Sequence, residues 1–233
     1  MSQNQIPNQK VLILDMDGVI IDSEPLHLKA YQTALAEFKV DYTVGQMREF
    51  LGRKDRECAA ALVERFGLPV STQELLQQKQ EVCFSLIRQE GKCRPGLLEL
   101  LREARDLGIA CGIASSATLA TIALVIDSLK IATFFQALTS GDEVLSGKPA
   151  PDIFLKAAER LATKPMDCLV FEDTATGITA AKAANMQCIS VPCDMTRYQD
   201  HKNADLQLDS LAQFDLPYWL RAGRLRKLGS NLS

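Results

Sequence analysis

The chain of 233 residues has the size of one or two globular domains. Its 47% hydrophobic and 24% charged residues exclude disorder, collagen and coiled coil as descriptions of the whole chain. Its 26 basic and 29 acidic residues leave a net charge of −3, and a mildly acidic chain is not typical of a nucleic-acid-binding protein. We therefore expect a globular protein with no nucleic-acid partner.

The first predicted strand is the apolar run at residues 11–14, and a long helical stretch follows it. Helical patterns occur at residues 26–38, 58–66 and 75–87. No convincing strand lies among them, so a helical segment is inserted directly after strand one. This pattern predicts a small helical cap domain at residues 22–93, on a core formed by residues 1–21 and 94–233.

Strands and helices alternate over the remainder of the chain. Apolar runs typical of buried parallel strands occur at residues 110–114, 168–171 and 188–191. Helical patterns lie between or beside them at residues 97–107, 122–129 and 153–161. This alternation predicts right-handed crossovers and an α/β fold with a doubly wound parallel sheet. The basic stretch at residues 219–227 is interpreted as a solvated final helix, with an amphipathic tail that contacts a partner or an acidic surface as the alternative.

The seven cysteines are an odd number and include no Cys-x-x-Cys pair, which argues against a disulfide framework or a structural zinc site. The first ten residues have no apolar signal core. No stretch approaches the ~20 apolar residues that a membrane span needs. We expect a cytoplasmic protein without membrane attachment.

Two aspartates stand at the end of the first predicted strand. Asp15 directly follows the apolar run, Asp17 comes two positions later, and Gly18 allows the backbone to turn away. Ligands of parallel α/β sheets bind at the carboxyl ends of the strands, and residues i and i+2 of an extended chain point the same way. Two carboxylates that face one small volume repel unless they share a cation or a proton, which indicates a metal site. A simple turn is the alternative, whereas an EF-hand loop is excluded because the apolar residues 19–21 follow.

Three further polar features follow later strands of the predicted sheet. Ser115 and Ser116 follow the second strand, Lys148 lies in the loop GKPAPD, and the pair Glu172 and Asp173 follows a third. Taken singly, they are also consistent with a helix N-cap, a solvated lysine and acids that complement a helix dipole. Taken together, they place acids, hydroxyls and a lysine at successive strand ends. Such a set can hold Mg²⁺ between carboxylates and neutralise a phosphoryl group.

Four sequence stretches carry a resemblance to a known family. They are LDMDGVIIDSEPLH, IASSA, SGKPAPDIF and VFEDTATGITAAKAANM. From about Val11 to about Leu211 the sequence resembles the haloacid dehalogenase (HAD) superfamily of phosphohydrolases. It is most similar to the subfamily with a helical cap inserted after the first strand, which includes β-phosphoglucomutase and many small sugar-phosphate phosphatases. The resemblance implies a Rossmann-like core beneath the cap.

The resemblance also implies catalytic roles. Asp15 matches the nucleophile that becomes an aspartyl phosphate, and Asp17 matches the acid that protonates the leaving oxygen and then activates water. Ser115 matches the phosphate-binding hydroxyl, and Ser116 beside it is a second substrate-binding candidate. Lys148 matches the lysine that balances charge between the phosphoryl group and the nucleophile.

Mg²⁺ is the cofactor that the resemblance implies. Asp173 matches a direct ligand, joined by Asp15 and the main-chain carbonyl of Asp17, and Glu172 would be a further partner of the metal site. The cation would screen the approach of a carboxylate to a phosphate dianion.

The cap is where the resemblance places substrate specificity. His27 falls where relatives have a histidine close to the site, with a partly buried helix histidine as the alternative. The basic loop with Arg53 and Arg56 resembles the specificity loop of these caps. Where the mutase has an arginine in this loop this chain has Asp55, which disfavours a strict mutase assignment. Lys79 is a weaker cap candidate, for which surface solvation is the favoured interpretation.

These observations predict a monomeric, Mg²⁺-dependent phosphatase of a small phosphorylated metabolite, with a sugar phosphate as the first candidate and an aspartyl phosphate as the intermediate. A β-phosphoglucomutase-type phosphotransferase is the first alternative. A receiver-type signalling module is the second, because it also uses strand-end aspartates, a hydroxyl and a lysine. It is disfavoured because the helical insertion and Asp17 suit turnover better than a lasting phosphoaspartate.

Overall fold

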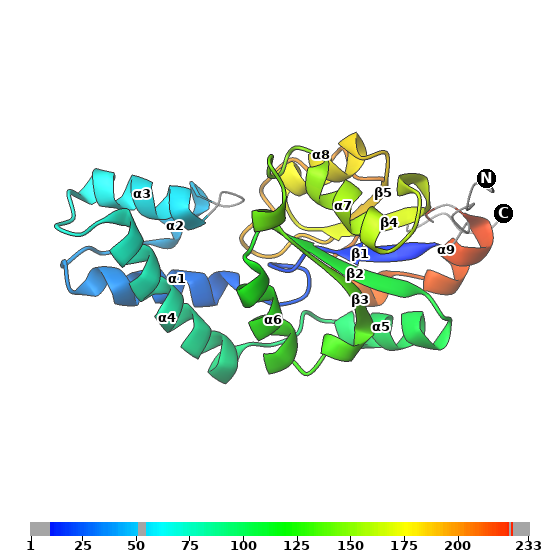
Figure 1. Cartoon of the computed structure of the whole chain (residues 1–233), viewed down its shortest axis with the longest axis horizontal. Coiled ribbons are helices and arrows are strands. Elements are labelled where there is room, and N and C mark those ends of the chain that lie inside the picture. The colour runs from blue at the N-terminus through cyan, green and yellow to red at the C-terminus, as the bar shows by residue number, and fades with distance from the viewer. Residues whose placement is uncertain (1–9, 51–54, 224, 226–233) are drawn as a thin grey trace, which may run out of the picture.

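The structure is a computed structural model that describes residues 10–50, 55–223 and 225. A six-stranded parallel sheet in the order β3-β2-β1-β4-β5-β6 lies between helices (Figure 1). The strands are β1 Val11–Leu14, β2 Ala110–Ser115, β3 Phe135–Ser140, β4 Cys168–Glu172, β5 Gln187–Ser190 and β6 Leu206–Gln207. The helices are α1 Glu24–Ala36, α2 Val44–Arg48, α3 Asp55–Phe66, α4 Thr72–Glu90, α5 Leu97–Asp106, α6 Leu119–Ser128, α7 Asp152–Arg160, α8 Ala175–Ala183 and α9 Leu216–Ala222. The predicted doubly wound α/β fold is confirmed.

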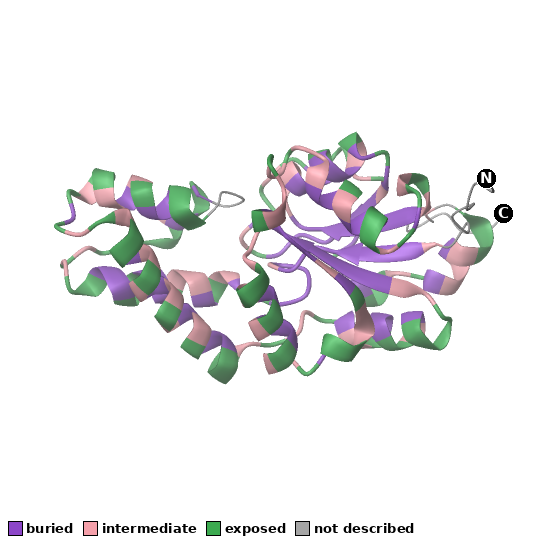
Figure 2. Cartoon of the chain, in the orientation of Figure 1, coloured by how far each residue is buried: buried purple, intermediate pink, exposed green. Residues whose placement is uncertain are grey.

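β1 lies at the centre of the sheet and pairs with β2 on one side and β4 on the other. Its four side chains are fully buried and alternate between two apolar clusters. Leu12 and Leu14 belong to the cluster that includes α5, whereas Val11 and Ile13 belong to the cluster that includes α7 and α8. A strand covered on both faces has no polar side, which explains its continuous apolar sequence. Figure 2 shows the central strands as the most buried part of the molecule.

The four predicted strands correspond to β1, β2, β4 and β5, whereas β3 and β6 were not predicted. β3 has the sequence FQALTS, and its polar residues interrupt the apolar run that marks a buried strand. The side chain of Gln136 accepts a hydrogen bond of 2.7 Å from the backbone N–H of Cys111, beside the register shift between β2 and β3. A polar residue within β3 therefore completes the pairing of the sheet. β6 has two residues, which is too short for a sequence pattern.

Helices α1 to α4 lie between β1 and α5 in the chain and to one side of the sheet (Figure 1). We call residues 24–90 the helical insertion. The predicted helical patterns fall in α1, α3 and α4, whereas the five-residue α2 was not predicted and is held by a capping box between Thr43 and Gln46. The insertion has its own apolar cluster, which includes Tyr31, Tyr42 and Phe50. It therefore packs around a core separate from the two that cover the sheet.

The two ends of the helical insertion are joined by backbone contacts. Ile21 and Cys93 form an antiparallel bridge, and the N–H of Arg94 donates to the carbonyl of Ile20 over 2.9 Å. Among the described residues, no helix combines the length and the apolar character needed to cross a membrane.

The final helix α9 packs against the core at its N-terminal part. Trp219 is 1% exposed, and the Lys10 ammonium lies 4.6 Å from the centre of its ring. The interpretation of this stretch as a solvated helix is therefore wrong at Trp219, because an indole buries a large apolar area. The cations beyond Gly223 lie outside the described residues.

Candidate active site

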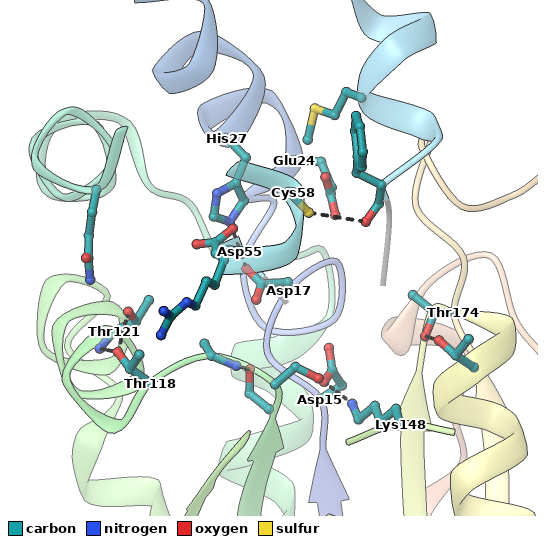
Figure 3. Close-up of a pocket in the computed structure, with 18 of the residues that line it drawn as sticks. Asp15, Asp17, Glu24, His27, Asp55, Cys58, Thr118, Thr121, Lys148 and Thr174 are labelled. Atoms are coloured by element: carbon teal, nitrogen blue, oxygen red, sulfur yellow. Dashed lines mark hydrogen bonds and ion pairs between the residues drawn. The ribbon is translucent and has the colours of Figure 1, made fainter. Parts of the chain in front are cut away.

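One cavity of about 500 Å³ lies at the carboxyl ends of β1, β2 and β4, beneath the helical insertion. Its lining brings together all predicted site residues that the structure describes: Asp15, Asp17, His27, Arg56, Ser115, Ser116, Lys148, Glu172 and Asp173. In Figure 3, Asp15 and Lys148 lie at the strand ends, and His27, Glu24 and Asp55 extend from the insertion toward them. Arg53 lies outside the described residues.

Asp15 is held rigidly at the centre of the sheet edge. Its N–H donates to the carbonyl of Phe171 over 3.0 Å, which continues the pairing of β1 with β4. Lys148 donates to Oδ1 of Asp15 and lies 2.6 Å from Oε1 of Glu172. Burial alone would lower the pKa of Lys148, but the charges of Asp15 and Glu172 raise it above its ordinary value. Lys148 is therefore a fixed positive charge between two carboxylates.

Three buried carboxylates crowd this part of the cavity. Ligand atoms of Asp15, Glu172 and Asp173 lie within 4.8 Å of one another. Burial and the neighbouring acids raise the pKa of Asp15 to about 8, although Lys148 opposes the shift. Burial, followed by the charges of Glu172 and Asp15, also raises the pKa of Asp173 well above its usual range. One ammonium group does not neutralise three carboxylates, so a divalent cation would stabilise the ionised cluster.

Asp173 has the geometry of a metal ligand. Its Oδ2 accepts a hydrogen bond of 3.1 Å from the hydroxyl of Thr196. Its Oδ1 is buried and has no hydrogen-bond partner among the described residues. A Cβ atom at Gly18 would overlap the Asp173 carboxylate, so only glycine fits beside this side chain. Oxygen donors of this kind suit Mg²⁺, and the residues present therefore fit a magnesium site.

Both oxygens of Glu172 already have protein partners. Oε2 accepts hydrogen bonds from the N–H of Asp173 and the N–H of Thr174, each over 2.9 Å. Oε1 accepts from Lys148. These contacts orient Lys148 and the start of α8. Glu172 is thus better suited to the surroundings of a metal than to direct ligation.

The carboxylate of Asp17 lies outside the cluster of three acids. Its Oδ1 accepts a hydrogen bond of 2.5 Å from Ser23 and lies 3.5 Å from Nε2 of His27. Burial opposes ionisation of Asp17, but the contacts with His27 and Ser23 keep its pKa below the ordinary value. Burial and Lys79 oppose protonation of His27, yet the neighbouring Cys83 and Asp17 keep its pKa well above its usual range. The contact between the two side chains therefore favours an ionised Asp17 beside a protonated His27.

Ser115 and Ser116 line the cavity at the end of β2. Ser115 is 1% exposed, and its hydroxyl accepts a hydrogen bond of 3.1 Å from the N–H of Ala117. The N-cap of α6 is Thr118, whose hydroxyl accepts from the N–H of Thr121. The alternative interpretation of the two serines as the N-cap is therefore wrong, and both are placed to meet a ligand.

Lys79 is buried rather than solvated, which corrects the favoured interpretation. It is 1% exposed, lies 2.7 Å from the Asp55 carboxylate and faces the Tyr31 ring at 5.1 Å from its centre. Asp55, at the start of α3, lines the cavity and is paired within the insertion.

Several lining residues were not predicted. Glu24 lies beside His27 in the cavity, and burial raises its pKa to about 7. Its only signal was its place in the DSEPLH stretch. The rest of the unpredicted lining includes Tyr31, Tyr42, Met47, Phe50, Leu76, Gln80, Thr118 and Thr121. Tyr31, Leu76 and Gln80 also belong to predicted helix patterns, so periodicity alone did not separate these three from the core.

The central strand β1 leads into the buried Asp15, which pairs with Lys148 from a loop, and Asp17 follows two residues later. This arrangement on a Rossmann-like sheet is typical of one class of hydrolases. The family described as Haloacid dehalogenase-like hydrolase matches residues 12–191 of this sequence. The chain therefore belongs to this family.

Relatives and solved structures agree with this assignment. The chain is 32% identical over 183 residues to fructose-1-phosphate phosphatase YqaB of Escherichia coli, a match that covers 77% of this chain and 95% of the relative. The crystal structure of CbbY from Rhodobacter sphaeroides in complex with phosphate matches with a TM-score of 0.81 and 28% identity, covering 88% of this chain and 96% of CbbY. β-Phosphoglucomutase from Clostridium difficile matches with a TM-score of 0.77 and 25% identity, covering 91% and 96%. The predicted enzyme class, a phosphatase of the HAD superfamily, is the class to which named relatives of this chain belong.

Proposed function

We propose that this protein is a Mg²⁺-dependent phosphatase that hydrolyses a small phosphorylated metabolite, with sugar phosphates as the first substrate class to test. The observation that carries the proposal is the placement of Asp15, which is buried at the end of the central strand and held by Lys148. A carboxylate oriented in this way can attack phosphorus once positive charge screens its repulsion from the phosphoryl oxygens. The named sugar-phosphate phosphatases among the relatives support this substrate class.

The division into domains belongs to the same proposal. Residues 22–93 form a helical cap, and residues 1–21 and 94–233 form the catalytic core. The bridge between Ile21 and Cys93 supports a boundary at these positions. A monomeric enzyme located in the cytoplasm completes the proposal.

Phosphoryl transfer begins with attack by Asp15. Lys148 holds Oδ1 of this carboxylate, and Ser115 and Ser116 contact the phosphoryl oxygens. The new Asp15–phosphorus bond forms as the ester P–O bond breaks, and the electron pair of that bond goes to the leaving oxygen, which takes a proton. In the second step Asp17 removes a proton from water, the water oxygen attacks phosphorus, and inorganic phosphate leaves Asp15 regenerated.

The proton for the leaving oxygen comes from the Asp17–His27 pair. Burial opposes both charges, but their mutual contact lowers the pKa of Asp17 and raises that of His27, so the imidazole is the group of the pair that holds the proton in this proposal. The contact of 3.5 Å between Nε2 of His27 and Oδ1 of Asp17 provides the route by which Asp17 acquires it. His27 is thereby a proton reserve for an acid that the fold otherwise keeps ionised.

Asp15, Asp173 and the main-chain carbonyl of Asp17 would hold Mg²⁺, with Glu172 in its surroundings. When bound, the cation supplies positive charge that screens the nucleophile from the phosphoryl oxygens. Lys148 supplies further positive charge at Oδ1 of Asp15.

A mutase outcome is disfavoured by Asp55. A mutase must hold a sugar with a second phosphate, and cations in the cap are the groups that would bind it. In this chain an acid takes the place of the mutase arginine and pairs with Lys79, and Arg56, one residue further on, is the described cation of the insertion that lines the cavity. Release of phosphate to water is therefore the expected outcome.

The experiment that tests the proposal uses p-nitrophenyl phosphate with Mg²⁺. Asp15→Asn should reduce hydrolysis at least about a thousandfold, because an amide is not a nucleophile toward phosphorus. Acid-quenched native protein should carry one phosphoryl group on Asp15, detected by mass spectrometry. Appreciable turnover by the variant would remove Asp15 as nucleophile.

A second experiment separates a phosphatase from a mutase. Incubation with β-glucose 1-phosphate and a bisphosphate primer should give inorganic phosphate, whereas glucose 6-phosphate would indicate a mutase.

A further inference from the structure

A turn between β5 and β6 contacts the helical insertion. We call residues 193–199 the docking loop. Its Met195 side chain packs against the apolar cluster of the insertion. The Tyr198 hydroxyl donates to the carbonyl of Arg48 over 3.3 Å, and the Arg48 guanidinium lies 5.4 Å from the centre of the Tyr198 ring. These contacts join α2 to the core at a point remote in sequence from the bridge at Ile21.

The opposite side of the docking loop faces the acidic cluster. Thr196 is fully buried, and its hydroxyl accepts from the N–H of Cys193 over 3.0 Å and donates to Oδ2 of Asp173 over 3.1 Å. The carbonyl of Thr196 lies 2.9 Å from Nε2 of the buried His201. Because its backbone and its hydroxyl both have fixed partners, Thr196 has a single orientation.

The hydrogen bond from Thr196 to Oδ2 of Asp173 in turn fixes the orientation of this carboxylate and of its other oxygen, Oδ1. Oδ2 accepts from the Thr196 hydroxyl and lies 3.5 Å from the Cys193 sulfur, whereas Oδ1 has no hydrogen-bond partner among the described residues. Gly18 lies directly against this carboxylate, so the side chain has little room to adopt another rotamer. Met195 is the neighbour of Thr196 in the chain, and a shift of one moves the other.

We propose that the docking loop links the seating of the helical insertion to the position of the Asp173 carboxylate. Thr196 is a positioning residue for the magnesium site, and Met195 and Tyr198 are its contacts with the insertion. When the insertion is seated, Met195 is held, Thr196 keeps its bond to Oδ2 of Asp173, and Oδ1 would be left to ligate the cation. This inference rests on the proposed function only for the identity of the cation.

Calorimetric titration of the full chain with Mg²⁺ alone tests the positioning role. Thr196→Val keeps the shape of the side chain but removes the hydroxyl, and it should weaken Mg²⁺ binding about tenfold, the effect expected when a partner of a metal ligand is lost. Thr196→Ser keeps the hydroxyl and should bind Mg²⁺ as the native chain does. Thermal unfolding shows that the variants are folded. Native affinity in the Thr196→Val protein would overturn the proposal.

A double-mutant cycle tests the link to the insertion. Met195→Ala should weaken Mg²⁺ binding about threefold in the native background and have no further effect in the Thr196→Val background, because coupled residues are not additive. Tyr198→Ala should behave as Met195→Ala does. The matched control is Asp194→Asn, since Asp194 is exposed and pairs with Arg197 in the same turn. Independent effects of Met195 and Thr196, or no effect of Met195→Ala, would overturn the link.

The binding measurements need no turnover, so they separate the two proposals. A chain that shows the coupling but hydrolyses no phosphate ester would contradict the proposed function alone. A chain that hydrolyses phosphate esters but shows no coupling would contradict the docking loop alone.

Discussion

The ammonium group of Lys79 lies 2.7 Å from the carboxylate of Asp55 and thereby joins the middle of α4 to the first turn of α3. The lysine is 1% exposed, whereas the aspartate side chain is more than half exposed. A buried ammonium is costly unless a counter-charge accompanies it. The start of α3, which borders the cavity, is therefore fixed by a residue of another helix.

Removal of the acid alone should destabilise the protein. Asp55→Asn leaves Lys79 buried without its counter-charge, and it should lower the free energy of unfolding by about 1–3 kcal/mol, less than for a fully buried pair because Asp55 reaches solvent. Adding Lys79→Met should recover most of this loss. Urea unfolding of the native chain, both single variants and the double variant measures it, and equal stabilities would contradict a structural role for the pair.

The loss of rate on replacing His27 or Asp17 should depend on the leaving group of the substrate. Asp17→Asn and His27→Gln should slow hydrolysis of an alkyl ester such as fructose 1-phosphate about 10²–10⁴-fold, the usual contribution of general acid catalysis. Formation of the phosphoenzyme from p-nitrophenyl phosphate should be affected much less, because p-nitrophenolate leaves without a proton. Burst kinetics with both substrates compare the two, and an equal loss with each would reject the proton reserve.

Gly18 should tolerate no side chain. Its φ is +78°, and a Cβ atom at this position would overlap the Asp173 carboxylate. Gly18→Ala should therefore displace Asp173 and abolish detectable Mg²⁺ binding by calorimetry. Gly67 offers the matched control, because its φ is also positive but a Cβ atom there would meet nothing within 4 Å. Gly67→Ala should lower stability slightly and leave Mg²⁺ binding unchanged.

Lys148 should contribute to stability as well as to catalysis. Lys148→Met removes the cation that lies between Asp15 and Glu172, so these buried acids must bind protons or repel one another. We expect a lower melting temperature and a loss that saturating Mg²⁺ partly restores, because the metal replaces the missing charge. Differential scanning calorimetry with and without Mg²⁺ measures both effects. A variant as stable as the native chain without Mg²⁺ would contradict this electrostatic account.

Stability should depend on Glu143 at acid pH. Its hydrogen bonds with Arg160 and Ser140 lower its pKa from 4.5 to about 2. A depressed pKa means that the ionised group stabilises the folded state above pH 4.5 and that this stabilisation is lost as the pH falls toward 2. At pH 6 the free energy of unfolding of the native chain should exceed that of Glu143→Gln, as measured by urea unfolding. The difference should be no more than about 1 kcal/mol, because the pair is partly exposed. The difference should shrink at pH 3, and a constant difference would contradict the assignment.

The parts of the fold with a local physical signature could be predicted from the sequence. β1 and the first four residues of β4 are buried on both faces and form uninterrupted apolar runs. The strand-end positions of Asp15 and Asp173 follow from those runs, because parallel strands end at one edge. β3 was not predictable in this way, because it includes the polar Gln136, whose side chain accepts a hydrogen bond from the backbone of the neighbouring strand β2.

The contacts of the helical insertion were less predictable, because they depend on how its helices meet. The sequence of α4 does not reveal that Lys79 is buried, since its partner Asp55 lies on another helix. The same is true of Thr196, which reaches Asp173 across 23 residues of chain. Such pairings arise from tertiary packing, for which a single sequence gives no periodic signal.

The backbone bridge between Ile21 and Cys93 brings the two ends of the helical segment together. The chain leaves and re-enters the sheet domain at neighbouring points, so the strand order is the same whatever lies between them. Doubling the length of such an excursion costs only about 0.6 kcal/mol in loop-closure entropy. Exchange of the segment would therefore keep Asp15, Lys148 and Asp173, which lie outside it, and would replace His27 and the other lining residues that it contributes.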